Sequence, residues 1–518
     1  PTPVDGRSRQ AQTAAGPSLL QRDGMIRQMS EMPDGTLVLY DGGAGVPEPG
    51  LSTLYLTRTF QVDDPAAIRA LQTEIEYSSG LVVWINGREV IRENLAPGRT
   101  GHRDAASVMK LDPWINQTSA GRWQHSWLGI DPGVLKAGQN VIAVELHKGP
   151  EPGLRSFYLS MDLRAYREVG FVKSPWLQGP SPDTMAVSFE TNVPALGEVR
   201  YGTSPARLDR VALAPQVAGT HHEIRLDRLP ANTRVYYQVI AHPVGWATGA
   251  DVTTPTRAFW THVESGQPFT FIAYGDNRSF PERHARLVRQ LWGDAVKSRV
   301  RFIINTGDLT EQGSPWDGWQ HEFFEPALPL MSSFPYYTSL GNHEGNNLAY
   351  YEYMSLPGNE AWYSFREGPA EFFAVNSSAP FEEGTPQYTW LASALESSSS
   401  PWKIVFFHHP PFSCTPDRKP GDPRVRQWLV PLFERTHVNL VVLGHDHLYG
   451  RSADVNGVRY VITGGGGAPP YPSEPDEINQ VCVTEQHYCV VDVSSQKLTL
   501  RAVALGGREL DSLTLSRP

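Results

Sequence analysis

The chain has 518 residues, of which 40% are hydrophobic and 19% charged, a balance that fits several globular domains and excludes a mostly disordered protein. The formal net charge is -10, and Lys and Arg form no block, so we expect no nucleic-acid scaffold as partner. No run of about 20 apolar residues is present, so we expect no membrane span. The polar opening is typical of a mature N-terminus after signal removal and predicts a secreted or periplasmic protein.

The three cysteines are few for this length, and an odd count cannot pair fully within one chain. Cys482 and Cys489 lie close in the sequence and could form a small disulfide loop, which would leave Cys414 over. The alternative is three buried, inert thiols.

Residues 1–50 are polar and turn-rich, and we interpret them as a tail with a lead-in strand over 36–40. Residues 51–166 alternate like β-strands, and Asn86-Gly87 between two alternating runs predicts a tight hairpin, because both residues tolerate positive φ. On the stretches SSGLVVWINGREV and LKAGQNVIAVELH, this region resembles the galactose-binding-like jelly rolls that accompany secreted enzymes. The resemblance implies either a carbohydrate ligand or a module that only packs.

Residues 170–262 form a second β-rich stretch. Leu229-Pro230 followed by Tyr236-Tyr237 resembles the end of a fibronectin III-like β-sandwich, in which a tyrosine near a strand corner bonds back to the backbone. Sandwiches of this kind commonly precede the catalytic domain of purple acid phosphatases, and this stretch resembles theirs.

From residue 268 to 518 the pattern becomes α/β. An apolar run over 269–274 is followed by Ser279-Phe280-Pro281-Glu282, which predicts a capping box with Pro in the first turn of a helix reaching about Ser298. Further strands are predicted over 301–305, 372–375, 403–407, 440–443, 459–462, 487–493 and 498–505. Strand, helix, strand indicates a layered α/β domain.

Five short segments follow predicted strands or apolar runs, and they hold residues that can bind metals. The segments are Gly275-Asp276, Gly307-Asp308, Gly341-Asn342-His343-Glu344, His408-His409-Pro410 and Gly444-His445-Asp446-His447. Each is weak alone, since Gly-Asp is an ordinary turn and a lone histidine is usually a satisfied polar residue. Together they place carboxylate, amide and imidazole ligands at strand ends, where α/β folds build their sites. This donor set suits first-row metals such as Zn, Fe or Mn.

The ordered set resembles the calcineurin-like metallophosphoesterase superfamily, in its purple acid phosphatase-like branch. That resemblance implies a β-rich N-terminal half followed by an αββα catalytic domain, a two-layer β-sandwich flanked by helices. It also implies two divalent or trivalent metal ions with the following roles: Asp276 and His447 bind the first ion, Asp308 bridges both ions, Asn342, His408 and His445 bind the second, and His343 is the catalytic histidine.

Two positions depart from the family pattern. Arg278 stands where many members have a histidine, and Glu311 stands where purple acid phosphatases have the tyrosine whose tyrosinate gives the purple colour. The fourth ligand of the first ion is therefore open: His284, Glu311 or a water-filled position are the alternatives. Arg278 could grip phosphate oxygens in a bidentate manner, or it could form a structural salt bridge.

These features predict an enzyme that hydrolyses small phosphate monoesters with a hydroxide generated between two metals. One alternative is a phosphodiesterase or nucleotide hydrolase, because the pocket walls lie in loops that the sequence does not define. Another is a surface-binding protein with a vestigial phosphoesterase domain.

Overall fold

The computed structural model describes residues 29–31, 37–40, 53–77, 80–98, 124–147, 159–312 and 318–517. The first two sheets come from residues before 167, in the strand orders β1-β2-β9-β4-β7 and β3-β8-β5-β6. Their strands are β1 Met29–Glu31, β2 Leu37–Tyr40, β3 Thr53–Val62, β4 Ala70–Tyr77, β5 Gly80–Ile85, β6 Arg88–Glu93, β7 Gln124–Ile130, β8 Gly138–His147 and β9 Leu159–Tyr166. They share one apolar core that includes Leu71, Ile75, Val83 and Val144.

The hairpin predicted at Asn86-Gly87 is confirmed. β5 and β6 pair antiparallel with Ile85 opposite Arg88, and the two turn residues have φ of 51° and 80°. These positive values are what a two-residue hairpin turn requires, and they explain why the sequence alone located it.

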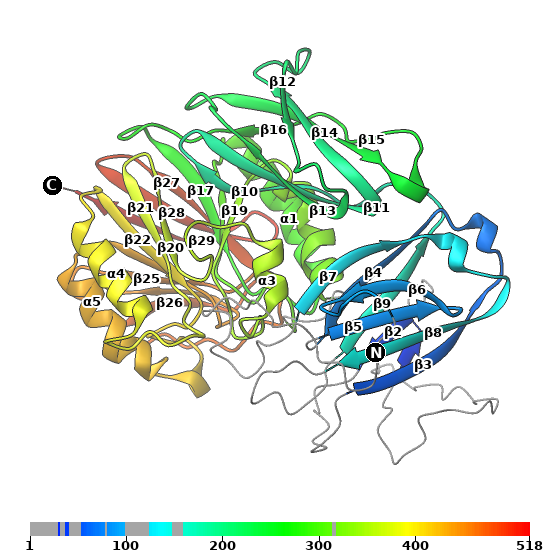
Figure 1. Cartoon of the computed structure of the whole chain (residues 1–518). Coiled ribbons are helices and arrows are strands. Elements are labelled where there is room, and N and C mark those ends of the chain that lie inside the picture. Colours follow the sequence, from blue (N-terminus) through cyan, green and yellow to red (C-terminus); the bar gives the residue numbers. More distant parts are fainter. Residues whose placement is uncertain are drawn as a thin grey trace.

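The next strands, in the green part of Figure 1, form a β-sheet around the long strand β11. The first half of β11 pairs with β10 and β13, and its second half pairs with β12 and β14. Bounds are β10 Phe171–Ser181, β11 Thr184–Gly202, β12 Arg210–Leu213, β13 Gly219–Leu226, β14 Arg234–Pro243, β15 Val252–Thr253 and β16 Arg257–Trp260. The expected backbone bond of the Tyr237 hydroxyl exists, but it runs to the Ser332 carbonyl, 2.7 Å away in the following α/β part. It therefore connects two parts of the chain rather than closing a corner within one.

The α/β part contains two more sheets, in the orders β19-β18-β17-β27-β28-β29 and β20-β21-β22-β23-β25-β24-β26. Bounds in the first are β17 Phe269–Tyr274, β18 Ile303–Asn305, β19 Tyr336–Thr338, β27 His487–Val493, β28 Lys497–Ala504 and β29 Glu509–Ser516. Bounds in the second are β20 Tyr363–Glu367, β21 Ala370–Ala374, β22 Trp402–Phe407, β23 Leu440–Leu443, β24 Tyr449–Ser452, β25 Arg459–Thr463 and β26 Asn479–Val483. The strands that precede the candidate motifs are parallel within each sheet: β17, β18 and β19 in one, β22 and β23 in the other.

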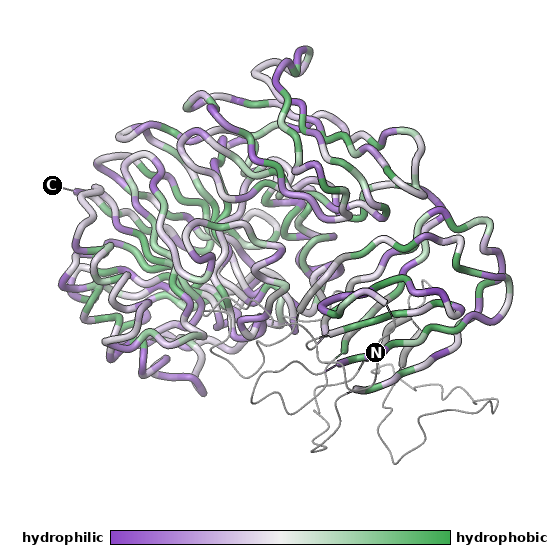
Figure 2. Tube along the Cα trace, viewed as in Figure 1, coloured by the Kyte–Doolittle hydropathy of each residue, from purple (hydrophilic) through white to green (hydrophobic). Residues whose placement is uncertain are grey.

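Helices cover the outer faces of these sheets (Figure 1). Their bounds are α1 Pro281–Lys297, α2 Glu325–Met331, α3 Leu348–Tyr353, α4 Pro386–Ser397 and α5 Val430–Arg435. Short 3-10 helices lie at 65–67, 132–134, 245–247 and 416–418, and π-helical segments at 318–324 and 425–429. Figure 2 shows hydrophobic residues concentrated along the interior strands of this part. One core joins both sheets with α1 and α2, and a second fills the space between the other face of the β22–β23 sheet and α4 and α5. None of the helices in the described ranges is long and apolar enough to cross a membrane.

Two local predictions need correction. The helix over 281–297 begins after Phe280 with Pro281 in its first turn, but no side chain caps it, and the Ser279 hydroxyl instead bonds the Glu311 carboxylate. The disulfide joins Cys414 to Cys482 and leaves Cys489 free and buried. Cys482 and Cys489 are close in sequence but do not pair, because Cys482 is placed on β26 opposite Gly450 of β24. Cys414 lies beside Gly450 and is therefore the cysteine within reach of Cys482.

Candidate metal centre

The loops that follow β17, β18 and β23 turn sharply to aim their polar side chains at one place. Asp276, Asp308 and His445 adopt left-handed backbone with φ of 58°, 54° and 70°. Such values are uncommon outside glycine and cluster at functional sites. Glycine is required beside them: a Cβ on Gly341 would lie 2.1 Å from Asp308 Oδ1, and one on Gly444 would lie 2.6 Å from Asp276 Oδ2. The loops can therefore approach closely only because these positions lack a side chain.

The first group consists of Asp276, Asp308 and His447, all buried, with their ligand atoms within 4.8 Å of one another. His447 Nδ1 donates to the Pro469 carbonyl at 2.8 Å, which turns Nε2 toward Asp276 Oδ1 at 3.5 Å. That Nε2 atom is buried and makes no hydrogen bond. The backbone amide of His445 donates to the Asp276 carboxylate and fixes its direction.

The second group brings together Asn342, His408 and His445, with His409 beside them. Asn342 Oδ1 lies 3.1 Å from His408 Nε2 and 3.0 Å from His445 Nδ1, and these two nitrogens are 3.1 Å apart. His408 Nδ1 donates to the Thr306 carbonyl at 2.9 Å, so Nε2 is the nitrogen that faces the group. Donation from the far ring nitrogen is how proteins orient histidines that bind metals.

Asp308 lies between the two groups. Its Oδ1 atom is 3.3 Å from His408 Nε2 and accepts from the His343 amide at 3.1 Å, and its Oδ2 atom is 3.3 Å from Arg278 Nε. Burial alone would raise the pKa of Asp308, but the positive charge on His408 and then His343 hold it well below its ordinary value. Burial likewise opposes protonation of His408, yet the Asp308 carboxylate raises the pKa of His408 to about 9.

These contacts fit bound cations. The carboxylates of Asp276 and Asp308, the amide oxygen of Asn342 and one ring nitrogen each of three histidines converge here. Without a cation, the negative charge of Asp308 is offset by a proton on His408. The buried, unpartnered Nε2 of His447 is a lone pair aimed into the same space. Unpaired buried groups of this kind are costly unless a partner binds. The residues present therefore suit a pair of first-row metal ions with oxygen and imidazole ligands.

The residues predicted to act on substrate border this centre. His343 Nδ1 donates to the Glu311 carbonyl at 2.7 Å, and its Nε2 atom lies 3.9 Å from Asp308 Oδ2. Arg278 bonds both Asp308 and the Glu311 carboxylate, so it stands at the edge of the first group. Burial alone would lower the pKa of Arg278, but the charges of Asp308 and then Glu311 raise it above its ordinary value.

Two of the three alternatives for a fourth ligand of the first ion, His284 and Glu311, have other partners in the structure. His284 is fully buried, and its two ring nitrogens bond the Tyr274 hydroxyl and the Glu322 carbonyl, each at 3.0 Å, so neither is available to a metal. Burial lowers the pKa of His284 to about 4. The Glu311 carboxylate is engaged by Arg278 and by Ser279, which places it beside the centre as a partner of Arg278.

Two supporting features escaped the sequence reasoning. Glu344 is buried and accepts from four backbone amides, those of Asp308, Leu309, Thr310 and Gly341, at 2.7 to 3.3 Å. Burial and then the nearby Asp308 charge raise its pKa to about 7. The sequence signal for this role was that Glu344 ends the candidate motif Gly341-Asn342-His343-Glu344.

The second feature supports the segment 445–447. Tyr471 stacks on His447 with ring centres 4.0 Å apart, and the Arg418 guanidinium lies over the Tyr471 ring at 4.6 Å. Arg418 also donates to the His445 carbonyl and to Asp446 Oδ1 at 2.9 and 3.1 Å. No spacing in the sequence relates Arg418 to this segment, because the contacts join separate loops.

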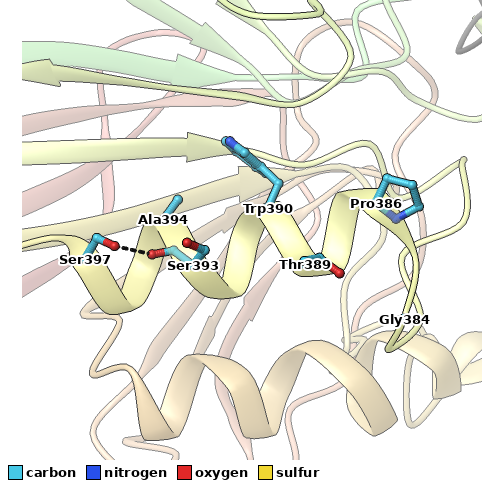
Figure 3. Close-up of a pocket in the computed structure, with 7 residues that line it drawn as sticks. All are labelled: Gly384, Pro386, Thr389, Trp390, Ser393, Ala394 and Ser397. Carbon is cyan, nitrogen blue, oxygen red and sulfur yellow. Dashed lines mark hydrogen bonds between the residues drawn. The ribbon is translucent and has the colours of Figure 1, made fainter.

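A groove of about 690 Å³ runs along the exposed side of α4 (Figure 3). It is lined by Gly384, Pro386, Thr389, Trp390, Ser393, Ala394 and Ser397. None of these side chains is ionisable and none belongs to the candidate motifs, so this groove is separate from the metal centre.

The chain is similar in sequence to known phosphoesterases and phosphatases. The calcineurin-like phosphoesterase family matches residues 269–449. A phosphoenolpyruvate phosphatase from Allium cepa is 27% identical over 57% of this chain, and a purple acid phosphatase from Glycine max is 26% identical over 53%. The matches cover 66% and 64% of those relatives, less than two thirds of their length.

A solved purple acid phosphatase from Lupinus luteus seeds shares the fold, with a TM-score of 0.60 and 17% identity over 91% of this chain and 94% of that one. This match confirms the predicted fold class, a β-rich N-terminal half followed by a metallophosphoesterase domain. Residues 269–449 therefore match the calcineurin-like phosphoesterase family, and the chain is similar to purple acid phosphatases in sequence and in fold.

Proposed function

We propose that this protein is a dinuclear metal-dependent phosphoesterase that hydrolyses phosphate monoesters of small molecules. The observation that carries the proposal is the convergence of the six predicted ligands, Asp276, Asp308, Asn342, His408, His445 and His447, in two groups joined by Asp308. The curated relatives named as phosphatases support the reaction class.

Two bound ions would supply Lewis acidity toward the phosphoryl oxygens and a water of lowered pKa. The protein's own contribution is to orient the ligands by hydrogen bonds on the side away from the ions. The Pro469 and Thr306 carbonyls accept from His447 and His408, and the His445 amide donates to Asp276. Such support keeps a ligand set in place before substrate arrives.

His343 suits the role of proton donor to the leaving oxygen. The Glu311 carbonyl accepts from Nδ1, which leaves Nε2 directed to the side of Asp308, and 23% of the side chain is exposed. A general acid must reach substrate while its second nitrogen is held, and this arrangement meets both conditions.

Arg278 suits the role of phosphate clamp. Its side chain is 12% exposed and its guanidinium is held between Asp308 and Glu311, so it adds a fixed positive charge next to the metal centre. A guanidinium in that position can donate to phosphoryl oxygens in a bidentate manner. Glu311 in place of a tyrosine means that we expect no tyrosinate colour.

We further propose that the protein works in an oxidising compartment, outside the cytosol. The Cys414–Cys482 disulfide supports this, because disulfides persist chiefly in secreted and periplasmic proteins. A carbohydrate ligand for the N-terminal sheets stays a prediction without further support.

The test is hydrolysis of a chromogenic phosphate monoester and its diester counterpart by protein loaded with Mn, Zn or Fe. Turnover should vanish in Asp308→Asn, which removes the charge shared by both groups. A higher rate on the diester would favour the phosphodiesterase alternative. Failure to bind any of the three metals would refute the enzyme and support the binding-protein alternative.

A further inference from the structure

His409 stands in the second group without a role in the pattern that identified the other ligands. One ring nitrogen of His408, of His409 and of His445 lies within 4.8 Å of the other two. Two of these three residues, His408 and His445, are already assigned to the second ion under the proposed function. The question is what the third imidazole does there.

The spacing of the three rings matches imidazoles around one ion. Their centres are 4.9 Å apart for His408 and His409, 5.0 Å for His408 and His445, and 4.5 Å for His409 and His445. An imidazole bound at 2.0–2.1 Å has its ring centre roughly 3.2 Å from the ion, so rings about 90–105° apart have centres roughly 4.5–5.1 Å apart. All three separations fall at this spacing.

His409 is also oriented as metal-binding histidines are. Its Nδ1 atom lies 2.8 Å from Ser377 Oγ, and its backbone amide donates to the same oxygen at 3.2 Å. Ser377 is itself buried, so this contact fixes the ring and leaves Nε2 as the nitrogen available to an ion. A partner on the far nitrogen is the usual support for an imidazole ligand.

We propose that His409 is a third imidazole ligand of the second metal ion, beside His408, His445 and the Asn342 amide oxygen. The inference rests on the proposed function and deepens it. It makes the two positions chemically unlike: beside the shared Asp308, the second has three nitrogen donors, whereas the first has the Asp276 carboxylate and one histidine, His447.

The consequence is a preference in metal choice. Imidazole favours Zn, Ni, Cu and Fe over Mn and Mg, whereas carboxylates accept the harder ions. The second position should therefore hold Zn or Co more tightly than Mn, and the first should discriminate less.

The experiment titrates metal-free full-length protein with Co(II) against a competing chelator and records the visible absorption of bound cobalt. The variants are His409→Ala and, as a matched control that also loses an imidazole, His437→Asn. His437 is exposed and precedes β23, at the end of the strand opposite the metal loops. Its positive φ of 57° is tolerated by asparagine.

We expect wild type and His437→Asn to bind two cobalt ions with the same spectrum. In His409→Ala, the affinity of one ion should fall at least about tenfold, the cobalt bands should shift, and free imidazole should restore the wild-type spectrum. The other ion should keep its affinity. Rescue by imidazole separates a missing ligand from a disturbed fold.

An unchanged spectrum and affinity in His409→Ala would overturn the inference while leaving the proposed function intact. So would a spectrum unchanged in shape while the affinity for inorganic phosphate falls, because His409 would then contact substrate and not metal. Equal loss of both ions without imidazole rescue would also overturn it. Failure of wild type to bind cobalt would instead remove the proposed function on which the inference rests.

Discussion

Glu344 offers the sharpest test of how the metal loops are held together. Both of its carboxylate oxygens are used: Oε2 accepts from the amides of Asp308 and Gly341, and Oε1 accepts from those of Leu309 and Thr310. In Glu344→Gln, one oxygen becomes an amide group that can only donate. Two buried backbone amides then face a donor instead of an acceptor.

The expected cost follows from that count. A buried donor left unsatisfied costs about 1–3 kcal/mol, so two of them should lower the free energy of unfolding by roughly 2–6 kcal/mol. For a domain of this size, about 2 kcal/mol corresponds to a fall in Tm of roughly 4–8 °C. Because the freed amides belong to the Asp308 and Asn342 loops, the affinity for metal should fall as well. The assay is a thermal melt of metal-free protein, followed by cobalt titration.

Glu322 provides a matched control. It also bonds two backbone amides near the site, those of Ser279 and Glu311, but both donate to its single Oε2 atom. Glutamine can keep both bonds by presenting its carbonyl oxygen, so Glu322→Gln should change Tm by no more than about 2 °C. Equal melting of the two glutamine variants would refute the view that Glu344 acts through both oxygens.

Three further predictions concern stability, substrate binding and the disulfide. The pKa of His284 is about 4 in the fold against 6.5 unfolded, so the stability of the fold is unaffected by this residue above pH 6.5 and falls by roughly 3 kcal/mol as the pH drops toward 4. The Tm of His284→Gln should therefore depend less on pH than that of wild type between pH 6.5 and 4. An equal dependence of Tm on pH in the two proteins would contradict the assignment. Arg278→Gln should raise KM for a phosphate monoester about tenfold or more with a smaller effect on kcat, and a KM equal to wild type would make Arg278 purely structural. Cys482→Ser should destabilise the protein by roughly 4 kcal/mol, because the Cys414–Cys482 bridge spans a separation of 68 residues; a melt within 1 °C of wild type would contradict this.

Much of the α/β framework could be predicted from sequence. The strand over 487–493 and the helix reaching residue 297 were located from apolar runs and periodicity, because these patterns are local and the buried strands are apolar throughout. The final strand, β29 Glu509–Ser516, was missed, since its half-exposed residues give a weak alternating pattern.

The candidate ligands were also readable in the sequence, because each follows directly on a strand that ends at the same edge. Asp276, Asp308 and Asn342 come after three neighbouring parallel strands, and His408 and His445 come after two in the facing sheet. Parallel strands end at the same edge of their sheet, so residues that follow such strands lie close together there. Their assignment to individual ions stays a prediction until metal is measured.

By itself, the sequence determined which segments become strands and which polar residues stand at their ends, since both depend on neighbours within a few positions. Only the tertiary structure decided the rest. In the fold, His284 hydrogen-bonds Tyr274 and Glu322, Cys414 forms a disulfide with Cys482, and the ring of His409 lies beside that of His445. Each of these choices joins loops far apart in the chain, and such contacts depend on how the two sheets pack, which no local pattern of residues encodes.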